Sequence, residues 1–354
     1  MRKVRFLVLA VIFNSFSFLQ MKMSQAQINF EGDIEANWDY EATSSKPEDT
    51  DATETKSNKL EGNGTFALLS KTSKGNYFAN AKIQTKLNFA GTVVPEDVFM
   101  KVGKTGSWDI TVGHFEALEL FSKGQDTLLS TAEGGNINSV NDARGRAAGA
   151  IMPQMHFGDL SLQLNILTKT GSQKHSSVAD EETATNYVAY RPAIQYISGA
   201  FSVALGLESV QESAQNSKSD ALNRRIENAG LKLKFDQESY YVALSIGSRK
   251  ESGNDAFDNI LDENTEMSAG LVALFTGLGP GKLGLGFFNN TKEVKDKQDV
   301  VTQVQYLSYA MPLLTDKSGF AIGINNSLSE IKPKTEAKTK NSNQSLRFRF
   351  TYTL

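Results

Sequence analysis

The chain contains no cysteine and three histidines among its 354 residues. The absence of cysteine excludes disulfide bonds, thiolate metal sites and a cysteine nucleophile. The histidines, His114, His156 and His175, do not form an H-x-x-x-H pair, and no G-x-S-x-G motif is present. We therefore expect no cofactor, no metal site and no enzymatic activity, although residues distant in sequence can assemble a catalytic triad that no local motif reveals.

Long hydrophobic runs are also missing. No stretch of about 18 apolar residues follows the N-terminal segment, which excludes a membrane protein built from spanning helices. The chain has seven prolines, no proline-rich linker and no long helical pattern, so we expect one mature domain. A transmembrane β-barrel remains compatible with this composition, because only every second residue of its strands meets lipid.

The N-terminal segment has the pattern of a secretory signal peptide. Basic residues at positions 2, 3 and 5 precede an apolar run from Phe6 to about Leu19, and Ser24-Gln25-Ala26 fits the small-x-small cleavage rule. We expect residues 1–26 to be removed and residues 27–354 to form the barrel; the alternative is a cytoplasmic protein with a chance apolar start. Removal leaves 33 basic against 40 acidic residues, so the formal charge changes from −3 to −7. This acidity argues against nucleic acid as a partner.

The mature chain begins and ends with strand patterns. Apolar and polar side chains alternate over residues 28–40 and again over residues 344–354. Period two over a dozen residues is a strong strand signal. The polar face of the first strand carries four carboxylates, which need water, and its apolar face ends in Trp38 and Tyr40, which suit a membrane interface. Pairing the last strand with the first would close a barrel and remove both sheet edges.

The same alternation recurs between these ends. We place about sixteen strands in an antiparallel, up-and-down transmembrane β-barrel, an all-β fold in which short and long connections alternate. The inner strands are expected near 60–69, 79–89, 97–102, 108–112, 146–157, 160–170, 185–197, 201–212, 226–235, 240–250, 266–276, 282–292, 299–311 and 319–331. The long polar connections are expected near 44–56, 171–184, 213–225, 251–265, 293–298 and 332–343. Fourteen or eighteen strands, or a soluble β-sandwich, are the alternatives.

One connection, the third long one, interrupts the alternation for roughly 28 residues, from Leu118 to Gly145. A loop of that length without its own secondary structure is usually functional or disordered. We expect it to fold into the lumen and narrow the pore; the alternative is a mobile surface loop. Its acidic residues are Glu119, Asp126, Glu133 and Asp142, and Arg144 and Arg146 stand where the next strand begins.

The architecture and one motif resemble a known family. Val112-Gly113-His114-Phe115-Glu116, followed by Leu120-Phe121 and Gly124-Gln125-Asp126-Thr127, is similar to the third-loop region of the raffinose-type sugar porins of gammaproteobacteria. The resemblance spans the mature chain. It implies a gram-negative outer-membrane location, a homotrimer and an inward third loop. The chain departs from the family at its end, because porins usually finish with an aromatic residue and this chain finishes with Leu354.

The expected function is passive diffusion of small hydrophilic solutes of the sugar class across the outer membrane. A general porin without a sugar site is the first alternative, and a barrel enzyme or adhesin is the second. Charged side chains that face each other across a narrow lumen would select among polar solutes. The residues expected along the pore are Lys82, Lys86, Lys101, Phe115, Glu116, Glu119, Phe121, Asp126, Glu133, Asp142, Arg144, Arg146, Arg191, Arg347 and Arg349.

The remaining expected partners lie around the barrel. They are outer-membrane lipid and lipopolysaccharide. Two acidic segments, residues 48–54 and 258–266, offer carboxylates to calcium or to the divalent ions that bridge lipopolysaccharide. Neither segment has EF-hand spacing, so solvated loop charge is the other interpretation. Phe115 and Phe121 offer either a surface for the apolar faces of sugars or an anchor for the loop.

Overall fold

The computed structural model describes residues 27–48, 51–120, 147–174, 182–215, 221–254, 260–334 and 337–354. These residues form sixteen strands. The strands are β1 (Gln27–Pro47), β2 (Thr53–Lys74), β3 (Tyr77–Asn88), β4 (Val93–Lys104), β5 (Trp108–Phe115), β6 (Ala147–Phe157), β7 (Leu160–Lys174), β8 (Glu182–Ser198), β9 (Phe201–Gln215), β10 (Ala221–Asp236), β11 (Tyr240–Asn254), β12 (Ile260–Leu278), β13 (Gly281–Val294), β14 (Gln298–Pro312), β15 (Ser318–Pro333) and β16 (Thr339–Thr353). Within these residues, no helix has the length and apolar character needed to span a membrane.

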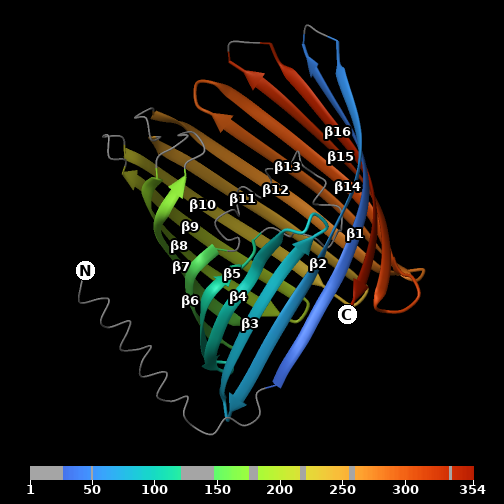
Figure 1. Cartoon of the computed structure of the whole chain (residues 1–354). Coiled ribbons are helices and arrows are strands. Elements are labelled where there is room, and N and C mark those ends of the chain that lie inside the picture. Colours follow the sequence, from blue (N-terminus) through green and yellow to red (C-terminus); the bar gives the residue numbers. More distant parts are fainter. Residues whose placement is uncertain are drawn as a thin grey trace.

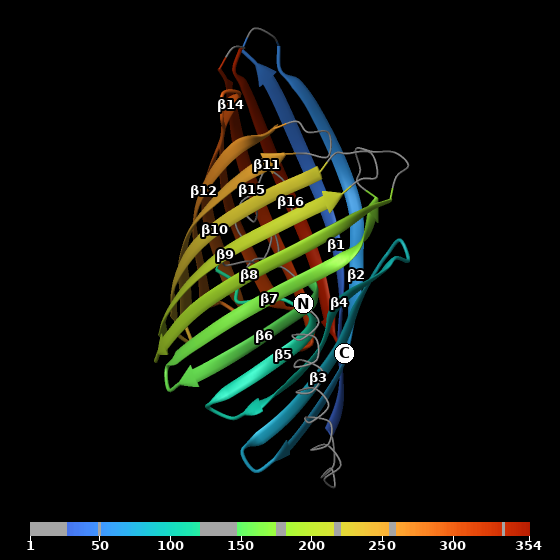
Figure 2. The ribbon, with the colours of Figure 1, turned by 90° about the vertical axis from the view of Figure 1, so that its left-hand side faces the viewer.

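Each strand pairs antiparallel with its neighbours along the chain, and β1 pairs with β16 to close the barrel. The closing register runs from Asp33 opposite Thr353 to Pro47 opposite Thr339. Figures 1 and 2 show β1 beside β16, with the hairpins β1–β2 and β15–β16 rising highest at the end that carries the long connections. The expected closed, sixteen-stranded meander is therefore confirmed.

The distribution of side chains differs from that in a soluble protein. Large apolar side chains such as Phe30, Leu162, Leu205 and Phe350 are exposed on the outer face. Many polar and charged side chains, including Asn165 and Arg191, are buried on the inner face beside two apolar clusters. A soluble protein rarely exposes so much contiguous apolar surface. An apolar outer band around a polar interior is the arrangement of a barrel that stands in lipid.

The strands extend farther than the sequence indicates, mostly at the end with the long connections. Residues 44–56 were expected to be a polar connection, but β1 continues to Pro47 and β2 begins at Thr53. The connection expected at 251–265 is largely strand as well, because β11 continues to Asn254 and β12 begins at Ile260. Where a strand leaves the lipid, both of its faces meet water, so the apolar alternation disappears although backbone pairing continues.

Short turns close the opposite end of the barrel. Gly158 and Gly199 adopt φ values of 63° and 56° in the two-residue connections β6–β7 and β8–β9. Two-residue hairpins favour turns with positive φ, which glycine reaches without steric cost. These tight turns set the register of the flanking strands, and the register decides which side chains face the lumen.

Candidate pore-lining site

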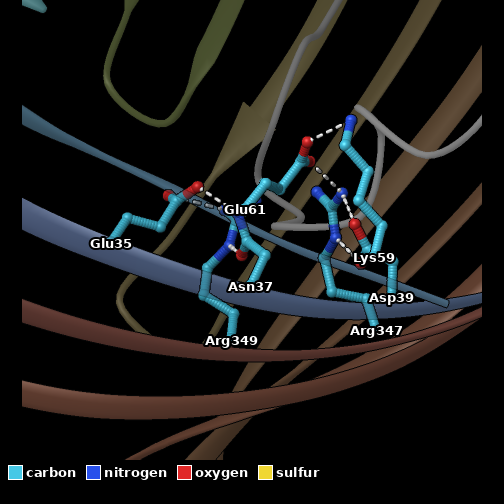
Figure 3. Close-up of polar contacts among 7 residues, drawn as sticks. All are labelled: Glu35, Asn37, Asp39, Lys59, Glu61, Arg347 and Arg349. Carbon is cyan, nitrogen blue, oxygen red and sulfur yellow. Dashed lines mark hydrogen bonds and ion pairs between the residues drawn. The ribbon is translucent and has the colours of Figure 1, made fainter. Parts of the chain in front are cut away.

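A group of seven polar side chains lies on the lumen face where the first strand, β1, pairs with the last strand, β16. This seam cluster comprises Glu35, Asn37, Asp39, Lys59, Glu61, Arg347 and Arg349 (Figure 3). Arg347 donates to both carboxylate oxygens of Asp39, with an Nη2–Oδ2 distance of 2.6 Å, and its Nη2 lies 3.0 Å from Oε1 of Glu61. Arg347 is therefore held in a two-acid clamp that spans β16, β1 and β2.

The second arginine of the seam cluster is held similarly. Nε of Arg349 donates to Oδ1 of Asn37 at 2.7 Å, and its Nη1 lies 3.2 Å from Oε2 of Glu35. The cluster contains three carboxylates and three cations, so its charges cancel. Both arginines lie on the face away from lipid, as expected, but each is paired with an acid on the same wall. Such pairing weakens the field that they project across the lumen.

Lysines on the neighbouring wall are also paired. Nζ of Lys82 lies 2.8 Å from Oδ2 of Asp97, and Nζ of Lys101 lies 3.3 Å from Oδ1 of Asp109. Lys86 interacts electrostatically with Asp33. The three lysines expected along the pore therefore have acidic partners on β1, β4 and β5, which were absent from the expected set.

Asp109 also contacts His156, which in turn contacts Ser161. Nε2 of His156 lies 2.9 Å from Oδ2 of Asp109, and Nδ1 of His156 lies 3.1 Å from Oγ of Ser161. The three residue types match a hydrolytic triad. However, Ser161 is paired with His156 of β6 on one side and with Gln195 of β8 on the other, so the main-chain amides beside it serve strand pairing. An oxyanion hole needs donors that are free to bind a developing charge.

Arg191 is buried in the part of the wall that β8, β9 and β10 form. It is 2% exposed, and its Nε lies 3.3 Å from Oε2 of Glu208. Oε1 of Glu208 accepts from Nδ2 of Asn228 at 3.0 Å. These three residues lie on β8, β9 and β10. Because Arg191 is buried and its charge is neutralised, its side chain contributes to packing and ion pairing within the barrel wall and is not presented to solutes in the lumen.

The start of the long loop turns into the barrel. Phe115, the last residue of β5, packs in an apolar cluster on the inner wall with Ala150, Leu167 and Val210. Five residues later, Leu120 is 2% exposed and lies against Gly230 of β10.

Gly230 lies on the lumen side of β10, and the residue before Leu120 faces the same strand. Gly230 shares the inner face with the buried residues Ile226 and Asn228. Glu119 interacts electrostatically with Lys232 of that strand. Glu116 is exposed. The described start of the loop, residues 116–120, therefore runs from β5 across the inner wall to β10.

The other expected pore residues on this loop, Phe121, Asp126, Glu133, Asp142, Arg144 and Arg146, lie outside the described residues. The residues expected from the sequence did not include the acidic residues that pair with the basic residues of the pore wall, although the pattern of the first and last strands indicates some of them. Alternation places Asn37 and Asp39 on the polar face of the first strand, and antiparallel pairing with the last strand sets them opposite Arg349 and Arg347.

Comparisons with known proteins agree with this geometry. The family model for porin-like glycoporin RafY matches residues 30–276, which is more than half of the chain. A comparison with curated proteins gives no match.

Solved structures share the fold at low sequence identity. The anion-selective porin from Comamonas acidovorans is 13% identical, with a TM-score of 0.65, over 93% of this chain and 100% of that one. The outer membrane channel DcaP of Acinetobacter baumannii is 11% identical, with a TM-score of 0.64, over 93% and 97% of the two chains. Salmonella typhi OmpF, in a complex with daunomycin, is 11% identical, with a TM-score of 0.55, over 93% and 98%. The chain therefore belongs to the porin-like glycoporin RafY family and is a β-barrel diffusion channel of the outer membrane.

Proposed function

We propose that this channel passes saccharides, that is, neutral solutes rich in hydroxyl groups. The observation that carries the proposal is the family match, whose description names a glycoporin. The lumen wall supports it in two ways. The arginines of the seam cluster are neutralised by acids on the same wall. The wall of β12–β15 presents uncharged polar side chains, among them Ser268, Asn290, Thr302, Asn325 and Ser327.

We further propose that residues 118–145 narrow the lumen. The inward path of residues 116–120 supports this proposal, because the chain has already reached the inner wall of β10 at Leu120. In this proposal the acids of the loop, Glu119, Asp126, Glu133 and Asp142, face basic side chains of the wall. Phe121, Arg144 and Arg146 would belong to the same waist.

Three other expectations enter the proposal. Residues 1–26 act as a cleaved signal peptide, and the mature barrel assembles as a homotrimer. Crosslinking in mild detergent is expected to give a trimer, and a monomer would contradict that assembly. We also propose that the chain has no enzymatic activity; in support, Ser161 of the serine–histidine–aspartate contact is paired with His156 of β6 and Gln195 of β8, so the main-chain amides beside it serve strand pairing.

A liposome-swelling series tests the saccharide proposal. Vesicles that contain the purified protein are placed in isotonic glucose, maltose and raffinose, and separately in non-sugar solutes of matching size. A saccharide channel passes raffinose faster than a non-sugar solute of the same mass, and raffinose lowers its ion current. A general porin shows one smooth decline of rate with solute size, and that result would contradict the proposal.

A further inference from the structure

A groove of about 1010 Å³ lies along β14, β15, β16, β1 and β2. Its lining comes from short runs of residues on each strand, centred on Tyr306, Asn325, Ser345, Thr43 and Thr55. Tyr306 is opposite Asn325, Asn325 is opposite Ser345, and Thr43 is opposite Thr55. Ser345 is two residues before Arg347 on β16, so strand alternation places this row of side chains on the lumen face.

Two side chains of the groove are buried and have no partner of their own. Asn325 is 4% exposed, and neither Nδ2 nor Oδ1 has a hydrogen-bond partner. Ser345 is 7% exposed, and its Oγ has no partner either. Buried polar groups in proteins are hydrogen-bonded as a rule. An amide and a hydroxyl on facing strands therefore offer donors and acceptors to a bound molecule.

An aromatic residue forms one end of the groove. The ring of Tyr306 is stacked with Phe288, with ring centroids 6.2 Å apart. The ring also covers Gly286, where an added Cβ would lie 1.9 Å from Cε1 of Tyr306. The glycine and the phenylalanine together hold the tyrosine ring in one position beside the uncharged polar side chains.

The charged side chains in and beside the groove are balanced, which favours a neutral ligand. Arg347, two residues from Ser345, is already paired with Asp39 and Glu61. The lining contains one acid and one base, Glu54 and Lys56, whose formal charges cancel. The row of side chains at the centre of the groove is uncharged and consists of one tyrosine, one asparagine, one serine and two threonines. Small-molecule sites combine apolar or aromatic surface with a few polar groups in a volume of roughly 300–1,000 Å³.

We infer that this groove is a saccharide-binding site on the lumen wall, in which Asn325 and Ser345 hydrogen-bond sugar hydroxyls beside Tyr306. The inference rests on the proposed saccharide function and assigns it to particular side chains. The volume accommodates an oligosaccharide. The site lies on β14–β16 and β1–β2, a different part of the wall from β10, where the long loop begins its inward path.

The test compares two asparagines, one inside the groove and one outside it. Asn325→Leu removes hydrogen bonding at nearly constant volume inside the groove. Asn289→Leu makes the same change on β13, away from the groove; the next residue, Asn290, is buried on the lumen wall, so the side chain of Asn289 points to the other face of the sheet. The readout is the raffinose concentration that half-blocks the ion current. Loss of one or two buried hydrogen bonds is expected to raise it about tenfold in Asn325→Leu. In Asn289→Leu it is expected to stay within about twofold of the wild-type value.

A milder variant guards against misfolding. Ser345→Ala, which removes a single hydroxyl, is expected to weaken the raffinose block as well, while heat-modifiable gel migration stays at the wild-type value. Normal block in Asn325→Leu and Ser345→Ala would overturn the site and leave the saccharide channel intact. Absence of raffinose block and of preferential saccharide passage in the wild-type protein would overturn the proposed function, and this inference with it.

Discussion

At the scale of single residues, the seam cluster joins the two ends of the chain with charges that are buried and paired. The side chain of Arg347 is 3% exposed, and that of Asp39 is 10% exposed. Breaking a buried ion pair by removing one partner leaves an uncompensated charge, which costs about 3–5 kcal/mol. An exposed pair contributes little, because solvent screens it. Stability is therefore expected to depend on Arg347 far more than on surface arginines.

Arg347→Gln is expected to lower barrel stability, since Asp39 and Glu61 lose their shared cation. The measurement is the temperature at which the folded, fast-migrating gel form disappears. Arg225→Gln is the matched control, because Arg225 pairs with Glu227 at the surface, where the two side chains are 59% and 50% exposed. We expect a clear decrease for Arg347→Gln and almost none for Arg225→Gln; equal decreases would show that the clamp contributes no more than a surface pair.

Apolar alternation in the sequence indicates which face of a strand a side chain occupies, but it does not indicate which side chain of the neighbouring strand is its partner. Alternation placed Arg347 and Arg349 on the polar face of the last strand, where the structure has them. Their partners, Asp39 and Asn37, depend on the register between two strands about 300 residues apart in sequence. Alternation specifies a face but not a register, so a set of pore residues chosen from basic side chains omitted the acids that neutralise them.

At the scale of elements, the start of the long loop is positioned by β10. An added Cβ on Gly230 would lie 2.8 Å from Cδ1 of Leu120. Because Gly230 faces the lumen, a larger side chain pushes Leu120 toward the barrel axis. Gly230→Val is therefore expected to lower single-channel conductance.

A compensating change tests whether that contact is the cause. Leu120→Ala makes room for the new side chain, so the double variant is expected to regain most of the lost conductance, as contacting residues are coupled. An unchanged conductance in Gly230→Val, or additive losses in the double variant, would mean that Leu120 is not positioned by β10.

The charge pair at the start of the loop bears on ion selectivity. Glu119 interacts with Lys232 on the inner wall. Glu119→Gln leaves the lumen more positive, so the reversal potential in a salt gradient is expected to shift toward anion selectivity. Lys232→Gln is expected to shift it toward cations. Glu227→Gln, on the outer face of β10, serves as the control and should leave the reversal potential unchanged. If neither Glu119→Gln nor Lys232→Gln shifts the reversal potential more than this control does, the pair does not lie along the path of the ions.

Element boundaries illustrate the limit of apolar alternation as a signal. The tight turns of the barrel agreed with the sequence, because glycine and short polar segments mark them locally. The opposite ends did not, since β1, β2 and β11 continue as strands where both faces are polar. Backbone hydrogen bonds to neighbouring strands sustain those extensions, and no local pattern of side chains records them.

At the scale of the whole molecule, the fold follows from a few features of the sequence. Strand alternation without long apolar runs, an even number of strands and complementary patterns at the two ends together specify a closed barrel in lipid. The lumen groove of Tyr306, Asn325 and Ser345 could not be derived in the same way. It depends on three strands aligned in register and on a glycine, Gly286, that seats the tyrosine ring.

The most direct test of the account is the ion current of wild-type protein in a planar bilayer, measured with increasing raffinose and, separately, with a polyethylene glycol of equal size. The account predicts open channels that raffinose blocks in a saturable manner at concentrations where the polymer has a weak, non-saturating effect. Equal effects of raffinose and polymer would contradict a saccharide channel and describe a general porin. No channel activity in either solution would contradict diffusion through the lumen itself.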